Sequence, residues 1–412
     1  MDIRQKTIEY IESLLQRAEI KLYGHLLDEN ERLMRHIEGT KIFINNFGSN
    51  KRFEIDGTPE IIQILLDDIF EKPFFNYQDP INYGTMMQII QDIHGAANMA
   101  MPKYIENLQM PIVATIENEE YNAKFLTKNR TGEKIEPALL FHSGIFTFSE
   151  IISDVYLGFL DNREINGKNE ILVGDIPKML NNENLLFSFA YVIKHLLSVN
   201  HLLGMPYVFG DHSARHISHV FRHCILIFIA AHEYSHYVFE YTDLDYDPMI
   251  TLSETDFDNT QRLFFESAWK NEFKADSLAL YLTLSVGKTL GYKKSNICTG
   301  IFLAITILDI LTKTQNLKDG IDIDSSMVLT ETHPPINMRK DIIGSALVKR
   351  HGHNPYSLAL IESFFYGLWE ATWRHVVQTE LVFRERGYKF YTLSEFAHSL
   401  KDVIKQKTIE FR

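Results

Sequence analysis

The stretch CILIFIAAHEYSHYVFEY, residues 224–241, is the most informative part of this sequence. Its first eight residues are all apolar, and the run is shorter than the roughly 20 residues that cross a bilayer, so it predicts a buried helix. The side chains of His232, Glu233 and His236 interrupt the apolar pattern. Burying two imidazoles and a carboxylate costs free energy unless another group satisfies them, and a bound metal ion would satisfy all three.

The spacing of this His-Glu-x-x-His pattern is typical of a metal site. His232 and His236 are four residues apart, so they project from one helical face about 40° from each other and can bind the same ion. Glu233 lies beside them, and zinc is the metal that the pattern predicts. The alternative is a helix with two packed or solvated histidines and no metal.

A third ligand is available 36 residues after His236, in the segment NEFKAD, residues 271–276. A catalytic zinc needs a third protein ligand and an open position for water. Glu272 and Asp276 share one face of a helix predicted from about residue 260 to 279, so Glu272 can bind the ion while Asp276 holds a ligating imidazole by its free N–H. The alternative is an acidic pair on a solvated helix surface.

The sequence around these motifs predicts an α+β fold that is rich in helices. Apolar residues at three- and four-residue steps predict an N-terminal helix within residues 8–37. Val, Ile, Phe and Thr between Pro111 and Phe148, with a turn at 129–132, predict several strands. The other expected elements are a hairpin over 43–55 and helices over 58–70, 86–101, 149–160, 183–203, 212–240, 260–290, 296–315, 336–350, 355–385 and 396–404.

Composition excludes several classes of protein. The 412 residues are 45% hydrophobic and 12% aromatic, which is enough for a buried core and too much for a disordered chain. With 41 basic and 54 acidic side chains the net charge is −13, so we expect no nucleic-acid partner. The sequence contains only two cysteines and shows no secretion signal and no apolar run long enough to span a membrane. We therefore expect a cytoplasmic protein without an integral membrane segment. The oligomeric state is left open.

Together, His232-Glu233-x-x-His236 and Glu272-x-x-Ala275-Asp276 resemble the gluzincin metallopeptidases. The resemblance is to soluble relatives of the CaaX prenyl endopeptidases, and the phage-exclusion peptidases of the Lit type show a related order of motifs. It implies a zincin-like core with a small mixed sheet and an active-site helix.

Two further segments contribute to the resemblance. His333-Pro334, followed by Arg339, resembles the late His-Pro-x-x-x-x-Arg segment of the family, which implies that His333 and Arg339 assist the oxyanion or orient Asp276. Residues 138–145 resemble the strand and turn that precede the active-site helices. The resemblance covers roughly residues 137–345. Changes in the hydrophobic pattern along the chain predict three parts: an N-terminal helical and hairpin extension at 1–135, a catalytic domain at 136–350 and a C-terminal helical appendage at 351–412.

The expected activity is zinc-dependent endopeptidase cleavage of an intracellular protein or peptide substrate, with one Zn²⁺ per chain. A zinc ion held by His232, His236 and Glu272 would lower the pKa of its bound water and polarise a peptide carbonyl, and Glu233 would be the general base. The Lit-type resemblance suggests a role in phage defence. The alternative from another class is a zinc-stabilised, non-catalytic interaction protein that uses the same ligands.

Four more histidines, His212, His216, His219 and His223, recur at steps of four, three and four before the metal motif. In a continuous helix they form one stripe, about 200° around the axis from His232. No carboxylate accompanies them, so we expect a packed or solvated stripe, with a second metal or pH-sensing site as the alternative.

Overall fold

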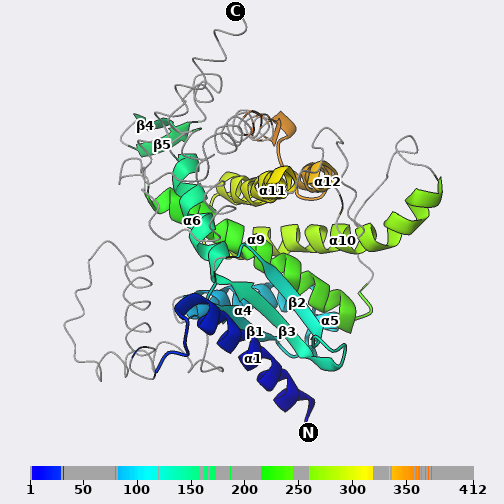
Figure 1. The fold of residues 1–412 in the computed structure, drawn as a ribbon. Coiled ribbons are helices and arrows are strands. Elements are labelled where there is room, and N and C mark those ends of the chain that lie inside the picture. The colour runs from blue at the N-terminus through cyan, green and yellow to red at the C-terminus, as the bar shows by residue number, and fades with distance from the viewer. Residues whose placement is uncertain are drawn as a thin grey trace, which may run out of the picture. The chain divides into compact units, whose positions relative to one another are not determined.

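The computed structural model describes most of the central part of the chain (Figure 1). The described residues are 2–28, 31, 79, 82–118, 120–157, 161–165, 168–172, 186, 215–244, 259–318, 334, 336–356 and single residues between 358 and 373. The predicted hairpin over 43–55 and the predicted helices over 58–70, 183–203 and 396–404 lie outside this set, apart from Leu186.

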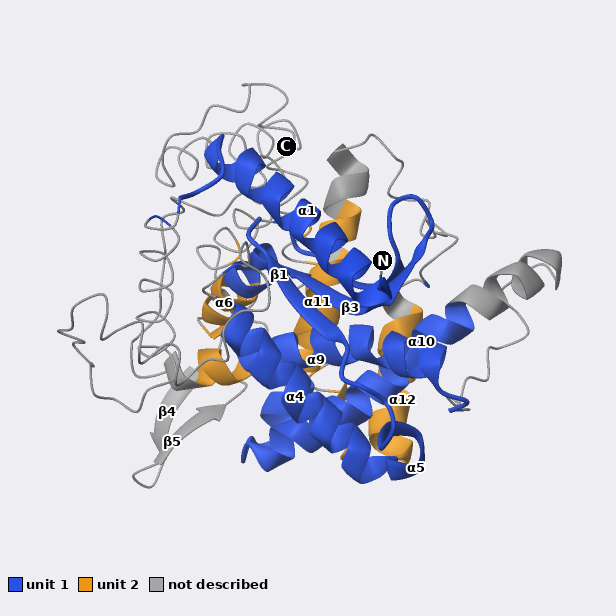
Figure 2. Ribbon diagram, turned by 90° about the horizontal axis from the view of Figure 1, so that it is seen from below, with its two compact units in different colours: residues 1–148, 223–298, 331–334 blue, residues 149–222, 299–330, 335–412 orange. Residues whose placement is uncertain are grey.

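The chain forms two compact units, each assembled from segments that are separate in the sequence (Figure 2). Unit 1 contains residues 1–148, 223–298 and 331–334, and unit 2 contains residues 149–222, 299–330 and 335–412. The predicted division into domains at 135 and 350 stays a prediction, and its first boundary falls within a strand of unit 1.

Unit 1 contains a three-stranded mixed sheet with the order β1-β3-β2. Strand β1 (Ile112–Ile116) runs parallel to β3 (Lys134–His142), and β2 (Ala123–Lys128) runs antiparallel to β3. A turn with Gly132 at φ 84° connects β2 to β3, and the Asn129 side chain accepts the backbone N–H groups of Thr131 and Glu133. The predicted strands and turn are therefore confirmed up to His142, whereas residues 143–148 are helical and not part of a strand.

Helix α1 (Ile3–Tyr23) covers one face of this sheet. Ile11 and Leu15, one turn apart, are buried against four apolar residues that alternate along β1 and β3, namely Ala114, Ile116, Ala138 and Leu140. The prediction that this helix continues toward residue 37 was wrong. It ends at Tyr23 because Gly24 takes a left-handed conformation, φ 81°, and donates its N–H to the Ile20 carbonyl at 2.8 Å.

Helix α4 (Tyr83–Ala100) lies on the opposite face of the sheet and contacts β1 and α10 (Figures 1 and 2). The short α5 (Pro102–Ile105) follows it. Two long helices, α9 (Arg215–Tyr241) and α10 (Asn259–Thr289), carry the predicted metal motifs. His94 of α4 is hydrogen-bonded through Nδ1 to the buried Tyr234 hydroxyl of α9 at 2.7 Å, which fixes α9 beside α4.

The remaining elements agree with the predicted helices and add one hairpin. Helices α11 (Lys294–Lys318) and α12 (Ile336–Lys349) were predicted within about three residues at each end. Helix α6 (Ser143–Leu157) begins six residues before the predicted helix over 149–160. Strands β4 (Asp161–Ile165) and β5 (Lys168–Leu172) pair antiparallel and were missed. The dipeptide Asn166-Gly167 between the two strands is typical of a two-residue hairpin turn.

One segment of α11, Lys294–Lys313, has the length and hydropathy of a helix that crosses a membrane. In the structure 65% of this segment is buried, and core helices of soluble proteins share the same length and composition. It is the one such segment among the described residues.

Of the histidine stripe, the His223 ring is packed against Tyr292. His223 is hydrogen-bonded through Nδ1 to the Tyr292 hydroxyl at 2.8 Å, and the two rings meet edge to face. This agrees with the expected packed stripe. His212 and the side chain of His216 lie outside the described residues.

The contact between α1 and the sheet gives a first testable expectation. Replacing Ile11 by Ala removes a fully buried side chain and leaves a cavity, so the free energy of unfolding measured by urea denaturation should fall by about 2–5 kcal/mol. Ile20 is 46% exposed on the same helix, and Ile20→Ala should change that free energy by less than about 0.5 kcal/mol. Equal effects of the two substitutions would contradict the described packing of α1.

Candidate metal centre

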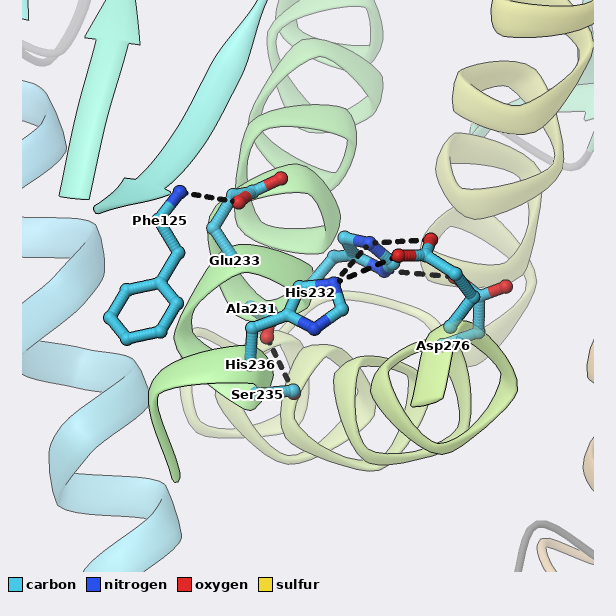
Figure 3. Close-up of polar contacts among 8 residues, drawn as sticks. Phe125, Ala231, His232, Glu233, Ser235, His236 and Asp276 are labelled. Atoms are coloured by element: carbon cyan, nitrogen blue, oxygen red, sulfur yellow. Dashed lines mark hydrogen bonds and ion pairs between the residues drawn. The ribbon is translucent and has the colours of Figure 1, made fainter. Parts of the chain in front are cut away.

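Helix α9 positions the two histidines because its other faces are apolar and buried. Ile225, Ile227, Ala231 and Val238 are fully buried, so the helix cannot rotate without exposing them. His232 and His236 then share one face, with their rings edge to face and Nε2 atoms 3.2 Å apart (Figure 3). The side chains are 12% and 24% exposed, so His236 is the more accessible.

Helix α10 brings the two predicted carboxylates to the same place. Glu272 is 7% exposed and Asp276 is fully buried. Oε2 of Glu272 lies 3.5 Å from Nε2 of His232, and its Oε1 lies 3.4 Å from Nε2 of His236. Phe273 and Ala275, on the intervening turn, are buried, which fixes the rotation of α10 about its axis.

The three donor groups fit a single metal ion. One nitrogen from each histidine and one oxygen from Glu272 all lie within 4.8 Å of one another. Bonds of about 2.0–2.1 Å in a tetrahedral site place neighbouring ligand atoms about 3.3 Å apart. The two Nε2 atoms are 3.2 Å apart, and each lies 3.4–3.5 Å from a different oxygen of the Glu272 carboxylate. His232, His236 and Glu272 could therefore hold one metal ion.

Asp276 and the electrostatics of His232 also favour a bound cation. Oδ1 of Asp276 lies 2.9 Å from Nδ1 of His232, the ring nitrogen that faces away from the other histidine (Figure 3). Burial lowers the pKa of His232, but hydrogen bonds to Asp276 and Glu272 and their negative charges raise it to about 10. Two carboxylates thus require positive charge at this point, and a metal ion can supply it in place of the imidazolium proton.

Glu233 points from α9 toward β2, where an interaction that the sequence did not reveal holds it. Its Oε2 accepts the backbone N–H of Phe125 in β2 at 2.8 Å (Figure 3). The pKa of Glu233 is raised overall, mainly by burial and also by the negative charge of Glu272. The positive charges of His232 and His236 and the hydrogen bond from Phe125 act in the opposite direction. Phe125 was missed because its contribution is a backbone N–H, which any residue except proline could supply.

The structure thus brings together five of the predicted site residues, and two remain outside this group. His232, Glu233, His236, Glu272 and Asp276 all belong to unit 1. Arg339 is buried on α12 in unit 2, and His333 lies outside the described residues, so their roles stay predictions.

The segment predicted to precede the active-site helices, residues 138–145, forms the end of β3 and the start of α6.

No protein-family model, no curated protein and no solved structure matches this chain.

Removal of the carboxylate ligand should abolish metal binding. The protein purified with zinc is expected to contain one metal ion per chain by mass spectrometry of the elements, and Glu272→Ala should lose most of it because only two ligands remain. The matched control is Glu240→Ala, which removes an exposed carboxylate from the last turn of α9. Full metal content in Glu272→Ala would exclude Glu272 as a ligand.

Asp276 should increase the affinity of the site for zinc without binding the ion itself. Asp276→Asn should weaken zinc binding about 10- to 100-fold in competition with a chromogenic chelator, because it loses the charged acceptor for Nδ1–H of His232. Ser277→Ala is the control, since the neighbouring Ser277 hydroxyl is buried and has no hydrogen-bond partner in the structure. If both variants bind zinc like the wild type, the contact between Asp276 and His232 does not support the site.

Proposed function

We propose that this protein is a zinc-dependent endopeptidase whose active site is the group formed by His232, His236, Glu272 and Glu233. The observation that carries the proposal is the convergence of three metal donors from two helices, with the carboxylate of a fourth residue, Glu233, held at the adjacent sheet edge. A peptidase of this kind needs both a metal site and a base beside it. The resemblance to gluzincins of the CaaX-type and Lit-type branches, with a zincin-like core, agrees with this order of residues.

Zinc is the metal that suits the donor set. Two imidazole nitrogens and one carboxylate oxygen are the ligands of many catalytic zinc sites, which keep a fourth position open. When bound, zinc lowers the pKa of water and polarises a carbonyl oxygen. His236 remains 24% exposed, so the group can be reached by solvent, as a catalytic site requires and a closed structural site does not.

Glu233 is the residue that would move the proton. A general base must be unprotonated before the reaction and must be able to give the proton to the leaving amine afterwards. Burial raises the pKa of Glu233, which makes its carboxylate a stronger proton acceptor than an ordinary glutamate, and the backbone N–H of Phe125 opposes that rise.

The edge of β2 is suited to bind an extended peptide. In the part of the chain that the structure describes, β2 pairs with β3 and with no second strand. The His142 N–H bonds to the Asn122 carbonyl, so residues 122, 124 and 126 direct their backbone groups toward β3, and residues 123 and 125 direct theirs away from it. A substrate strand can pair with this outward edge next to Glu233.

The proposed substrate is an intracellular protein, and the proposed location is the cytoplasm, with phage defence as the suggested role. Quantitative proteomics of cells that produce the wild type or the Glu233→Gln variant would identify the target. A single protein cut only by the wild type would support a dedicated substrate, whereas broad degradation would contradict it. The alternative function, a zinc-stabilised interaction protein, has the same ligands and predicts no difference between these cells.

Glu233→Gln separates catalysis from metal binding. The amide cannot accept the proton from water, so turnover of a peptide substrate should fall at least about 100-fold while zinc content stays at the wild-type level. Turnover is measured by mass spectrometry of a digested peptide library, and zinc by elemental analysis of the same preparation. Glu240→Gln, an exposed change on the same helix, should keep full turnover. Wild-type activity in Glu233→Gln would refute the proposed base.

A further inference from the structure

An aromatic cluster lies next to the proposed base on the same helix and strand. Phe125 of β2 meets Tyr237 and Tyr241 of α9 with ring centroids 5.9 and 6.5 Å apart, and the two tyrosines are 5.4 Å apart. Tyr237 is 3% exposed and its hydroxyl is hydrogen-bonded to the Gln109 carbonyl, whereas Tyr241 is 45% exposed. Tyr237 therefore belongs to the core, and Tyr241 presents an aromatic ring to solvent.

The register of β2 determines which substrate residue would reach this cluster. Leu126 packs on the side of the sheet that α1 covers, and neighbouring residues of a strand alternate between faces. The Phe125 side chain therefore lies on the other face, toward α9, while its backbone N–H points outward along the sheet edge. Residues directly opposite each other on paired strands place their side chains on the same face. A peptide residue opposite Phe125 would thus direct its side chain toward the Phe125 and Tyr241 rings.

The contact between Glu233 and Phe125 marks this register as close to the reacting bond. The Glu233 carboxylate oxygen at 2.8 Å from the Phe125 nitrogen lies where a carbonyl oxygen of a paired strand would accept the same N–H. A bound peptide would replace the carboxylate at that donor. The residue opposite Phe125 therefore sits next to the base, within about two residues of the cleaved bond, since a strand rises about 3.3 Å per residue.

We propose that Phe125 and Tyr241 determine specificity by selecting a large apolar or aromatic side chain at the substrate residue opposite Phe125. This inference rests on the proposed peptidase function. The half-buried Phe125 ring and the exposed Tyr241 ring give such a side chain apolar surface and edge-to-face partners, which small or charged side chains cannot use. The side chains of Phe125 and Tyr241 thus act on specificity and take no part in metal binding or proton transfer.

The test is digestion of a proteome-derived peptide library with the full-length, zinc-loaded protein, followed by mass spectrometry of the new termini. Wild-type protein should cut with an enrichment of Phe, Tyr, Trp, Leu or Met at one fixed position within about two residues of the bond. Tyr241→Ala should reduce that enrichment about 3- to 10-fold and leave preferences at other positions unchanged, because it removes one aromatic contact. Phe125→Ala should act at the same position.

Two variants control for general effects. Tyr241→Phe keeps the ring and should keep the preference, and Tyr356→Ala, which removes a tyrosine that is 82% exposed in unit 2, should leave the cleavage pattern unchanged. The specificity inference is overturned if Glu233-dependent cleavage shows no such enrichment, or if Tyr241→Ala does not alter the enrichment. Either result leaves the proposed peptidase function intact. Absence of any Glu233-dependent cleavage overturns both.

Discussion

The structure of unit 1 depends on the burial of two carboxylates opposite two imidazoles. Glu272 and Asp276 would be too costly to bury as isolated charges, and the contacts with His232 and His236 across the interface of α9 and α10 offset part of that cost. This constraint fixes how the two helices are rotated about their own axes. A half turn of either helix would separate the carboxylates from the imidazoles and expose the apolar residues beside them.

The three-stranded sheet contributes to the site through the edge of β2, which contacts Glu233. Helix α1 covers one face through Ile11 and Leu15, and α4 covers the other, which leaves the edge of β2 as the part of the sheet that meets Glu233. The backbone donor of Phe125 and the side chain of Glu233 come from segments 108 residues apart. Their contact connects the sheet directly to α9, the helix that carries the two candidate histidine ligands.

The sequence predicted the parts of the site that depend on residue type and helical spacing. His232 and His236 could be found because a four-residue step places them on one face, and Glu272 and Asp276 because zinc chemistry requires a third ligand and a partner for the imidazole. The end of α1 at Tyr23 was missed because Gly24 acts through its left-handed conformation, which a hydrophobic pattern does not contain. Phe125 could not be predicted, since any residue at that register would offer the same N–H.

The origin of the ligands in two separate helices has a thermodynamic consequence. His232 and His236 belong to α9 and Glu272 to α10, with residues 242–258 of the chain between these helices. An ion bound by all three is a cross-link that the unfolded chain cannot form in the same geometry, so its binding free energy adds to the stability of the fold. At a free ion concentration 100 times the dissociation constant, this linkage amounts to about 2.7 kcal/mol. Scarcity of the ion would therefore weaken the packing of α9 against α10 as well as the site itself.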